Sequence, residues 1–237
     1  MTPAKPGPYH LALDITDLVQ EGQNHLALRC IAPGIQGAVR IHVAGPQRLT
    51  TGNVLVDTPG WQGGPAPVRV RTEVVNDSDR PFDGQLVVSI NGPEDDQLVT
   101  ASAQVTLAAG QRRPVTLTTD PVPDPPLWDI GQARLCTARV TLKQAERALQ
   151  VEQRQFGFRW SRFDAQKGFF LNGRRVQLRG VVFSTGPKTH ESRSAEFAYE
   201  IGLLQEMGVN FVRVNDGIDR GLIQACDRAG ILTCAPV

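Results

Sequence analysis

Candidate catalytic and binding residues gather near the C-terminus of this 237-residue sequence. Arg213 stands in the apolar run 210–214, Asn215 and Asp216 follow it, and Glu191 lies in the polar stretch after an earlier apolar run. If the two runs are neighbouring parallel strands, both polar stretches open on one side of the sheet, where the chemistry of βα barrels takes place. A carboxylate pair such as Glu191 and Asp216 could then perform acid/base hydrolysis.

The same residues also have a plainer interpretation. Acidic side chains in polar loops are usually only solvated, and an arginine at a strand end can simply bridge neighbouring strands. We therefore assign no catalytic residue from the sequence, and name Arg213, Asn215 and Asp216 as candidates for substrate binding.

Histidine and cysteine are scattered along the chain. Neither an HExxH motif nor a Cys/His ligand spacing occurs, so the sequence predicts no metal site and no cofactor. The cysteines have mostly apolar neighbours, which predicts small buried thiols. They are Cys30, Cys136, Cys226 and Cys234.

The segment that carries the candidate residues alternates between strand and helix patterns. Strand patterns cover 176–183 and 210–214, and a third begins at Ile231. Helical spacing covers 195–207 and recurs in a second helix before the third strand, with Gly208 and Gly230 as C-terminal stops. The alternation predicts right-handed crossovers and a parallel sheet. The apolar face of the second helix consists of Leu222, Ile223, Cys226 and Ala229.

Residues 58–159 show short strands with period-two alternation and turn residues between them. The Gly/Pro-rich stretch 58–65 precedes these strands and predicts a domain boundary. Such a series predicts an antiparallel β-sandwich of about 100 residues, the size of an immunoglobulin-like domain. The strands are expected near 68–74, 86–90, 101–107, 115–117, 138–142 and 149–155.

Residues 1–57 hold few strand patterns, at 10–13, 25–31 and 39–43. So few strands bury too little surface to offset chain entropy, so we expect this segment to be part of a larger β-domain.

Composition narrows the choice of partners. The formal net charge of +1, without a lysine or arginine block, does not favour nucleic acid or an anionic membrane. No apolar run approaches the roughly 20 residues that span a bilayer, and the N-terminus lacks the apolar core of a signal peptide. We therefore expect a soluble, cytoplasmic protein.

Several phrases, in order along nearly the whole chain, resemble the family 2 glycoside hydrolases, which include β-galactosidases, β-glucuronidases and β-mannosidases. They are Asp14–Leu18 with Glu21–Arg29, Pro126–Asp129, Phe156–Arg159, Phe170–Arg174 with Leu178–Val181, Gly208–Arg213 and Cys226–Leu232. The resemblance implies a multi-domain β plus α/β fold. It comprises the C-terminal part of a jelly-roll sugar-binding-like domain (1–57), an immunoglobulin-like β-sandwich (58–159) and the N-terminal part of a (β/α)8 TIM barrel (160–237).

The resemblance also implies a function. Intact members hydrolyse O-glycosyl bonds of β-linked sugars with retention, through two glutamates on later barrel strands, and Arg213 would support the nucleophile. Neither glutamate has a counterpart here, and residues 160–237 fall far short of the about 250 residues of a closed barrel. We expect a fragment or a truncated, divergent relative that is inactive as this chain alone.

Departures from the family pattern keep other hypotheses open. Val182–Ser184 stands where members commonly carry pocket Asn and His residues, and Val214–Gly217 replaces a polar run. The chain could instead be a non-catalytic sandwich that binds carbohydrate or another protein. It could also be half of a split glycosidase, whose barrel a partner chain completes, or a homo-oligomer. The three tryptophans, predicted to pack between domains rather than to stack on sugars, are Trp61, Trp128 and Trp160.

Overall fold

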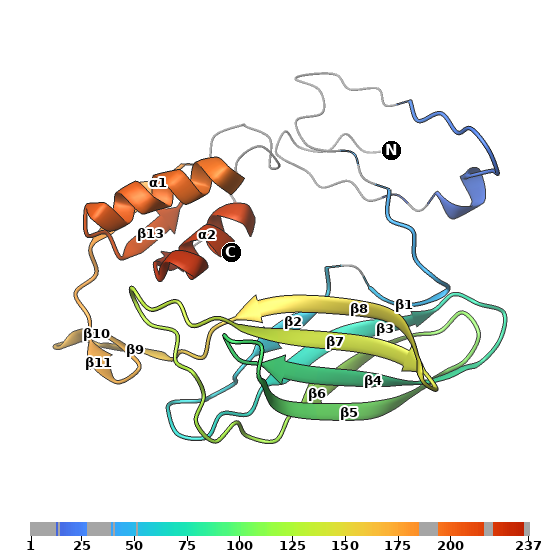
Figure 1. Ribbon diagram of the computed structural model, residues 1–237, viewed down its shortest axis with the longest axis horizontal. Helices are drawn as coiled ribbons and strands as arrows, with labels where there is room; N and C mark the ends of the chain where they lie inside the picture. Colours follow the sequence, from blue (N-terminus) through green and yellow to red (C-terminus); the bar gives the residue numbers. More distant parts are fainter. Residues whose placement is uncertain are drawn as a thin grey trace.

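The computed structural model describes residues 13, 15–27, 39, 41–50, 52–184, 194–215 and 220–234. β-strand is the main regular structure of this part (Figure 1), which comprises a β-sandwich, a small antiparallel sheet beside it, and a parallel sheet covered by two helices. Within it, no helix is long and apolar enough to cross a membrane.

The first sheet of the sandwich is built on β3 (Arg69–Asn76). β1 (Gln47–Leu49) pairs with its C-terminal end, β2 (Leu55–Asp57) with its N-terminal end, and β6 (Arg112–Thr118) along nearly its whole length, all antiparallel. β1 and β2 precede residue 58, so this sheet extends across the boundary predicted there.

The second sheet has the antiparallel order β5–β4–β7–β8. In β4, alternate side chains such as Leu86, Val88 and Ile90 are fully buried, as period-two alternation predicts for a strand with one face in the core. The strands expected in this region are thereby confirmed. The bounds are β4 (Phe82–Asn91), β5 (Gln97–Leu107), β7 (Cys136–Gln144) and β8 (Arg147–Phe156).

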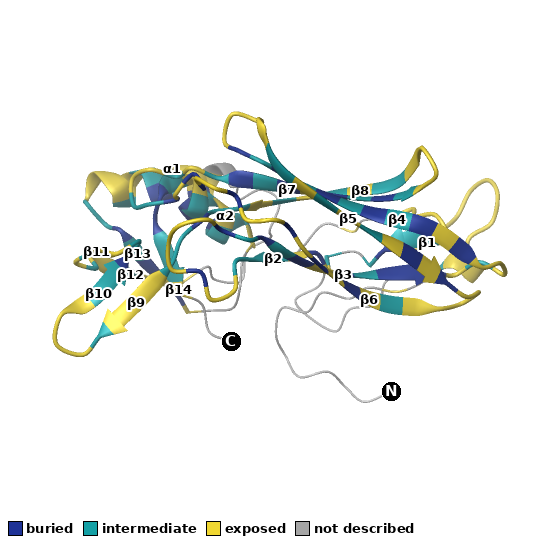
Figure 2. Cartoon of the chain, turned by 90° about the horizontal axis from the view of Figure 1, so that it is seen from below, coloured by how far each residue is buried: buried dark blue, intermediate teal, exposed yellow. Residues whose placement is uncertain are grey.

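One hydrophobic core lies between the two sheets. It contains Val70 and Val74 of the first sheet together with Val88 and Val140 of the second. Buried segments, in dark blue, accordingly occur on strands of both sheets (Figure 2). A polar contact also joins the sheets, because the backbone N–H of Leu49 in β1 donates a hydrogen bond to Gln150 of β8 at 2.9 Å.

The N-terminal segment differs from the expectation. Its described part holds the short 3-10 helix η1 (Thr16–Leu18). The predicted strands 25–31 and 39–43 are wrong for the residues that the structure describes, which are not in strands; their other residues lie outside the described part. Ile41 and Val43 are 70% and 94% exposed, so the alternation of apolar residues there reflects no packed sheet.

A small antiparallel sheet that was not predicted follows the sandwich. It consists of β9 (Ser161–Asp164), β10 (Gly168–Leu171) and β11 (Arg174–Arg175). Asn172 and Gly173, with φ of +49° and +80°, form the two-residue turn between β10 and β11. An Asn-Gly pair suits this turn because both residues tolerate the left-handed region.

The C-terminal part forms a parallel sheet in the order β12 (Gly180–Phe183), β13 (Phe211–Val214), β14 (Leu232–Cys234). The predicted parallel pairing is therefore confirmed. The first strand is shorter than the predicted 176–183, because the side chain of Asn210 bonds the backbone there. Asn210 accepts a hydrogen bond from Arg179 N at 2.8 Å and donates one to Gln177 O at 2.9 Å.

Helices α1 (Ser194–Glu206) and α2 (Arg220–Ala229) cover one face of this sheet. Their side chains Phe197, Ile201 and Leu222 form a second hydrophobic core with Val212 and Val214 of β13. The opposite face carries exposed side chains on each strand, and it is the face that could hold chemistry.

Both helices end as the sequence predicts. At α2, Gly230 has φ of +67°, Ile231 N–H donates to Cys226 O at 2.9 Å, and Gly230 N–H donates to Asp227 O at 3.4 Å. This is the Schellman pattern, in which a left-handed residue lets the chain satisfy the last helical carbonyls. Gly208 ends α1 in the same way, with φ of +74°.

Candidate functional site

Arg213 lies on the face of the parallel sheet that the helices leave open. It pairs in register with Val182 of β12 and Cys234 of β14, and all three side chains are exposed. Period-two alternation explains the placement, since Val212 and Val214 point to the helix side and are buried.

Asn215 follows β13 directly. Its backbone N–H donates to the carbonyl of Phe183, the last residue of β12, at 3.0 Å, and the residue is exposed. Asp216, the third predicted binding residue, lies outside the described part of the chain, as does Glu191. The structure thus describes Arg213 and Asn215 at one end of the parallel sheet.

This strand end is a donor-rich surface. The Arg213 guanidinium carries five N–H donors in a plane that suits a carboxylate. Within the described ranges, no carboxylate pairs with it. An incoming carboxylate or hydroxyl could therefore be bound here, whereas the described residues supply no acid/base pair.

The cysteines divide into two classes. Cys136 and Cys226 are buried, and burial raises the pKa of both thiols to about 12, so neither is a thiolate near neutral pH. Cys234 is exposed, which corrects the expectation of a buried thiol; it sits on the open face of β14 where no helix covers it. Cys30 lies outside the described residues.

Metal ligands do not gather in the part of the chain that the structure describes: it contains no group of three or more His, Cys, Asp or Glu side chains that could hold an ion.

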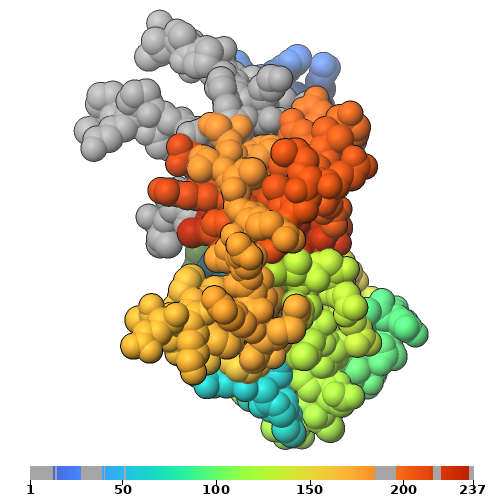
Figure 3. Space-filling model, turned by 90° about the vertical axis from the view of Figure 1, so that its left-hand side faces the viewer, coloured from blue at the N-terminus to red at the C-terminus, as the bar shows by residue number. Residues whose placement is uncertain are grey.

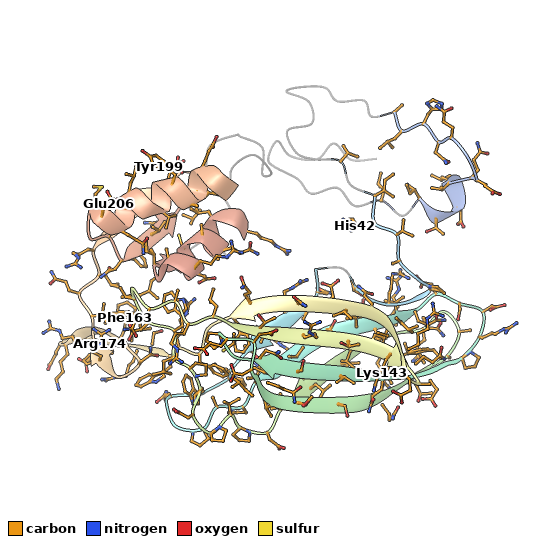
Figure 4. The ribbon with its side chains drawn as sticks, in the orientation of Figure 1. His42, Lys143, Phe163, Arg174, Tyr199 and Glu206 are labelled. Atoms are coloured by element: carbon orange, nitrogen blue, oxygen red, sulfur yellow. The ribbon has the colours of Figure 1, made fainter. Side chains whose placement is uncertain are left out.

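Two hollows of the surface lie away from Arg213. A groove of about 240 Å³ between α1 and α2, lined by Ala198, Ile201, Gln224 and other residues, lies on the helix side of the sheet. A polar cleft of about 450 Å³ lies at the opposite end of the sandwich from the small sheet, as the labels Lys143 and Arg174 show (Figure 4). The polar side chains that line this cleft are Asp83, Gln85, Gln104, Lys143, Gln144 and Glu146.

The tryptophans take different places. Trp61 packs inside the sandwich, edge to face with Phe158 at 6.0 Å, so the expected interdomain position is wrong for this residue. Trp160 packs against the sandwich core and lies near Gly173 of the small sheet. Trp128 is fully buried and donates from its indole to Asp227 of α2 at 2.7 Å, which confirms packing between parts of the chain.

Arg159 and Asp227 contact each other in the structure, although the sequence predicted no contact between them. They form an ion pair at 3.4 Å between the end of the sandwich and α2. Each stands in one of the family-like phrases, yet opposite charges far apart in sequence gave no sign of contact.

Comparisons with known proteins agree with the resemblance. Residues 56–159 match the family model described as "Glycosyl hydrolases family 2". The β-galactosidase BoGH2A of Bacteroides ovatus is 26% identical over 202 residues, covering 84% of this chain and 24% of that protein.

Solved structures give the same result. A Bacteroides uniformis β-glucuronidase has a TM-score of 0.71 and 30% identity, covering 76% of this chain and 22% of the other. The β-glucuronidase 2 of the same organism has a TM-score of 0.74 and 28% identity, covering 81% and 24%. The chain spans between 14% and 24% of the length of the curated relatives that it matches. The sandwich region therefore matches the model of the family 2 glycosyl hydrolases, and the wider chain is similar in structure to members of that family.

Proposed function

We propose that this chain is the sandwich and the first βα units of the catalytic barrel of a family 2 enzyme that hydrolyses O-glycosyl bonds of β-linked sugars. We further propose a division into jelly-roll, immunoglobulin-like sandwich and barrel, with the barrel at 160–237 and the first boundary before β1 instead of at residue 58, because β1 and β2 pair with β3 of the sandwich. The observation that carries the proposal is the parallel order β12–β13–β14, with helices on one face and Arg213 on the other.

The open face supports the barrel assignment. Parallel sheets are normally buried on both faces, and in a βα barrel the face opposite the helices lines the interior. Val182, which is 63% exposed, would face that interior. Further parallel strands would cover it.

Arg213 and Asn215 would then stand at the carboxyl end of a barrel strand, where catalysis takes place. We assign them, with Asp216, to the substrate side of the site. Arg213 would orient a carboxylate, which in this family is the nucleophile that later strands carry. Retaining hydrolysis needs two carboxyl groups about 5 Å apart, so the chain alone is expected to be inactive.

A hydrolysis assay tests inactivity. The purified chain should release no chromophore above a buffer blank from nitrophenyl β-glucuronide and β-galactoside, while an active β-glucuronidase run in parallel does. The variants Glu191→Gln and Asp216→Asn should match the parent chain. Turnover by the parent that either variant abolishes would overturn the claim that this chain lacks catalytic machinery.

Sequencing the coding DNA on both sides of this segment tests the family role. We expect further barrel strands with two glutamates, either in the same reading frame or in an adjacent one that encodes a partner chain. Flanking DNA that encodes no such barrel strands would overturn the assignment to a catalytic barrel.

The polar cleft at the far end of the sandwich supports a second candidate, a module that binds carbohydrate. Amide side chains such as Gln85 and Gln104 offer donors and acceptors for hydroxyl groups there. Binding on a glycan array that Gln85→Ala removes, together with no hydrolysis in any assembled form, would favour this candidate over a catalytic role.

A further inference from the structure

The last turn of α2 is held by residues of the sandwich. Trp128 Nε1 donates a hydrogen bond to the carbonyl oxygen of Asp227 at 2.7 Å, and Gly131 N–H donates to the carbonyl oxygen of Gly230 at 3.3 Å. Both donors belong to the segment that leads into β7. In the space-filling view, the orange and red surface of the helix-covered part accordingly meets the yellow-green surface of the sandwich (Figure 3).

Carbonyl groups at a helix C-terminus need such donors, because the last four have no partner within the helix. The turn at Gly230 satisfies some of them, and Gln205 of α1 donates to the carbonyl of Ala229 at 2.7 Å. N–H donors at this end also stabilise the helix, because their partial positive charge faces the negative pole of the helix dipole. Trp128 therefore adds a second and shorter hydrogen bond to the Asp227 carbonyl, which accepts from Gly230 N–H only at 3.4 Å.

Side chains reinforce the backbone contacts. The Arg159 guanidinium stacks over the Trp128 ring at 4.3 Å and pairs with the Asp227 carboxylate at 3.4 Å. Trp128 is fully buried, while Arg159 and Asp227 are 35% and 29% exposed. A cation over an indole ring and beside a half-buried carboxylate fixes both partners in orientation.

The same segment also holds the small sheet. Asn172 donates to the carbonyl oxygen of Trp128 at 2.9 Å, and Arg174 pairs with Asp129 at 3.0 Å. Trp128 and Asp129 thus contact three parts of the molecule: the sandwich, the small sheet and the helix-covered sheet.

We propose that Trp128, Arg159 and Asp227 form a latch through which the sandwich positions helix α2, and with it the strands β13 and β14. The latch acts at the amino ends of the parallel strands, opposite the ends that carry Arg213 and Asn215. Its role is positional and goes beyond the proposed function, because it does not depend on whether the chain takes part in sugar hydrolysis.

Hydrogen exchange on the full chain tests the latch. The amide of Ile231 reports the closing turn of α2, and the amides of β4 report the sandwich core. Trp128→Phe keeps an aromatic ring but removes the N–H donor, and it should speed exchange at Ile231 by about tenfold, the effect of one lost buried hydrogen bond. Exchange in β4 should stay as in the parent chain.

Arg159→Gln is a second variant, and the chain offers a matched control for it. Arg162 pairs with Asp164 at 3.4 Å and stacks on Phe170 at 4.5 Å, the same chemistry in the small sheet without contact to α2. Arg159→Gln should speed exchange at Ile231 several-fold, Arg159→Lys should speed it less, and Arg162→Gln should leave it unchanged.

Two results would overturn the latch. Exchange at Ile231 that stays at the parent rate in Trp128→Phe and Arg159→Gln would show that α2 needs no support from the sandwich. Equal acceleration in β4 and at Ile231 would show a general loss of stability instead of a local role. The exchange rates at Ile231 and in β4 do not depend on glycoside hydrolysis. A result against the latch can therefore be told apart from a result against the proposed function.

Discussion

At the scale of single residues, Gly230 meets two demands at once. Its φ of +67° lies in the left-handed region, and a Cβ there would stand 2.5 Å from Gly131 N and 3.0 Å from Asp129 O. Gly60 also has φ of +67°, but nothing lies within 4 Å of a Cβ built on it. Comparing substitutions at the two glycines therefore distinguishes the cost of backbone strain from the cost of a steric clash between parts of the chain.

Alanine substitutions at both glycines should give different losses. Gly60→Ala bears only the left-handed strain and should lower the free energy of unfolding by about 1 kcal/mol. Gly230→Ala adds a clash with backbone atoms, which cannot rotate away, and should lower it by about 3 kcal/mol or more. Urea unfolding measures both, and equal losses would contradict the close approach.

Asp227 shows how surroundings decide the behaviour of one carboxyl group. Burial raises its pKa above the usual value of 3.8, and the nearby Arg159 only partly opposes this effect. The Asp227 carboxyl therefore binds a proton more tightly in the folded state than in the unfolded chain. The carboxyl contributes stability that is fully present below its unfolded pKa and is lost as pH rises through the raised folded value.

The variant Asp227→Asn, which stays neutral, should reveal this pH dependence. The stability of the parent chain relative to Asp227→Asn should be greatest at acidic pH, below 3.8, and should fall as pH rises toward neutral. Urea unfolding of both proteins at several pH values measures the difference. A difference that grows from acidic to neutral pH would mean that the pair with Arg159 outweighs the cost of burial.

At the scale of elements, a side chain can form the hydrogen bonds to the backbone at the point where the hydrogen bonds between two strands end. Asn210 is 5% exposed and bonds to the backbone of Gln177 and Arg179 just before β12 begins. Asn24 makes similar backbone bonds, accepting from Gln20 N at 3.0 Å and donating to Gln20 O at 2.8 Å, but in an exposed segment. Burial should make the first pair of bonds matter more.

Replacing each asparagine by alanine tests this. Asn210→Ala removes a buried side chain and both of its bonds to the backbone just before β12, and should lower the free energy of unfolding by about 1–2 kcal/mol. Asn24→Ala exposes the corresponding backbone groups to water and should change it by less than about 0.5 kcal/mol. Thermal or urea unfolding measures both, and similar losses would show that the Asn210 bonds do not tie β12 to β13.

At the scale of the whole molecule, the described residues form two hydrophobic cores with different surroundings. The sandwich core is enclosed between two sheets, whereas the parallel sheet is covered on one face and exposes Val182 and Arg213 on the other. Such a layer has fewer buried contacts and should open before the sandwich does. The latch at Trp128 is therefore placed where the less protected layer meets the more protected one.

Local patterns sufficed to predict much of this architecture. The sandwich strands, both helices and their stops at Gly208 and Gly230 followed from period-two alternation, helical spacing and the left-handed preference of glycine. These signals are local, because they depend on residues a few positions apart. Arg213 could be predicted at a strand end for the same reason.

Partners distant in sequence decided the rest. Apolar alternation around Ile41 predicted a strand that does not form there, since alternation shows what a strand could bury but not whether a neighbouring strand exists. Asn210 shortened β12, and Cys234 became exposed because the helices cover the other face. The contact of Trp128 and Arg159 with Asp227 likewise arises only when the sandwich and α2 come together. The sequence by itself determined the sandwich strands, the two helices and the resemblance to a family, whereas tertiary packing decided which side chains meet and whether a strand finds a neighbour, because hydrogen bonds and burial depend on distance in space.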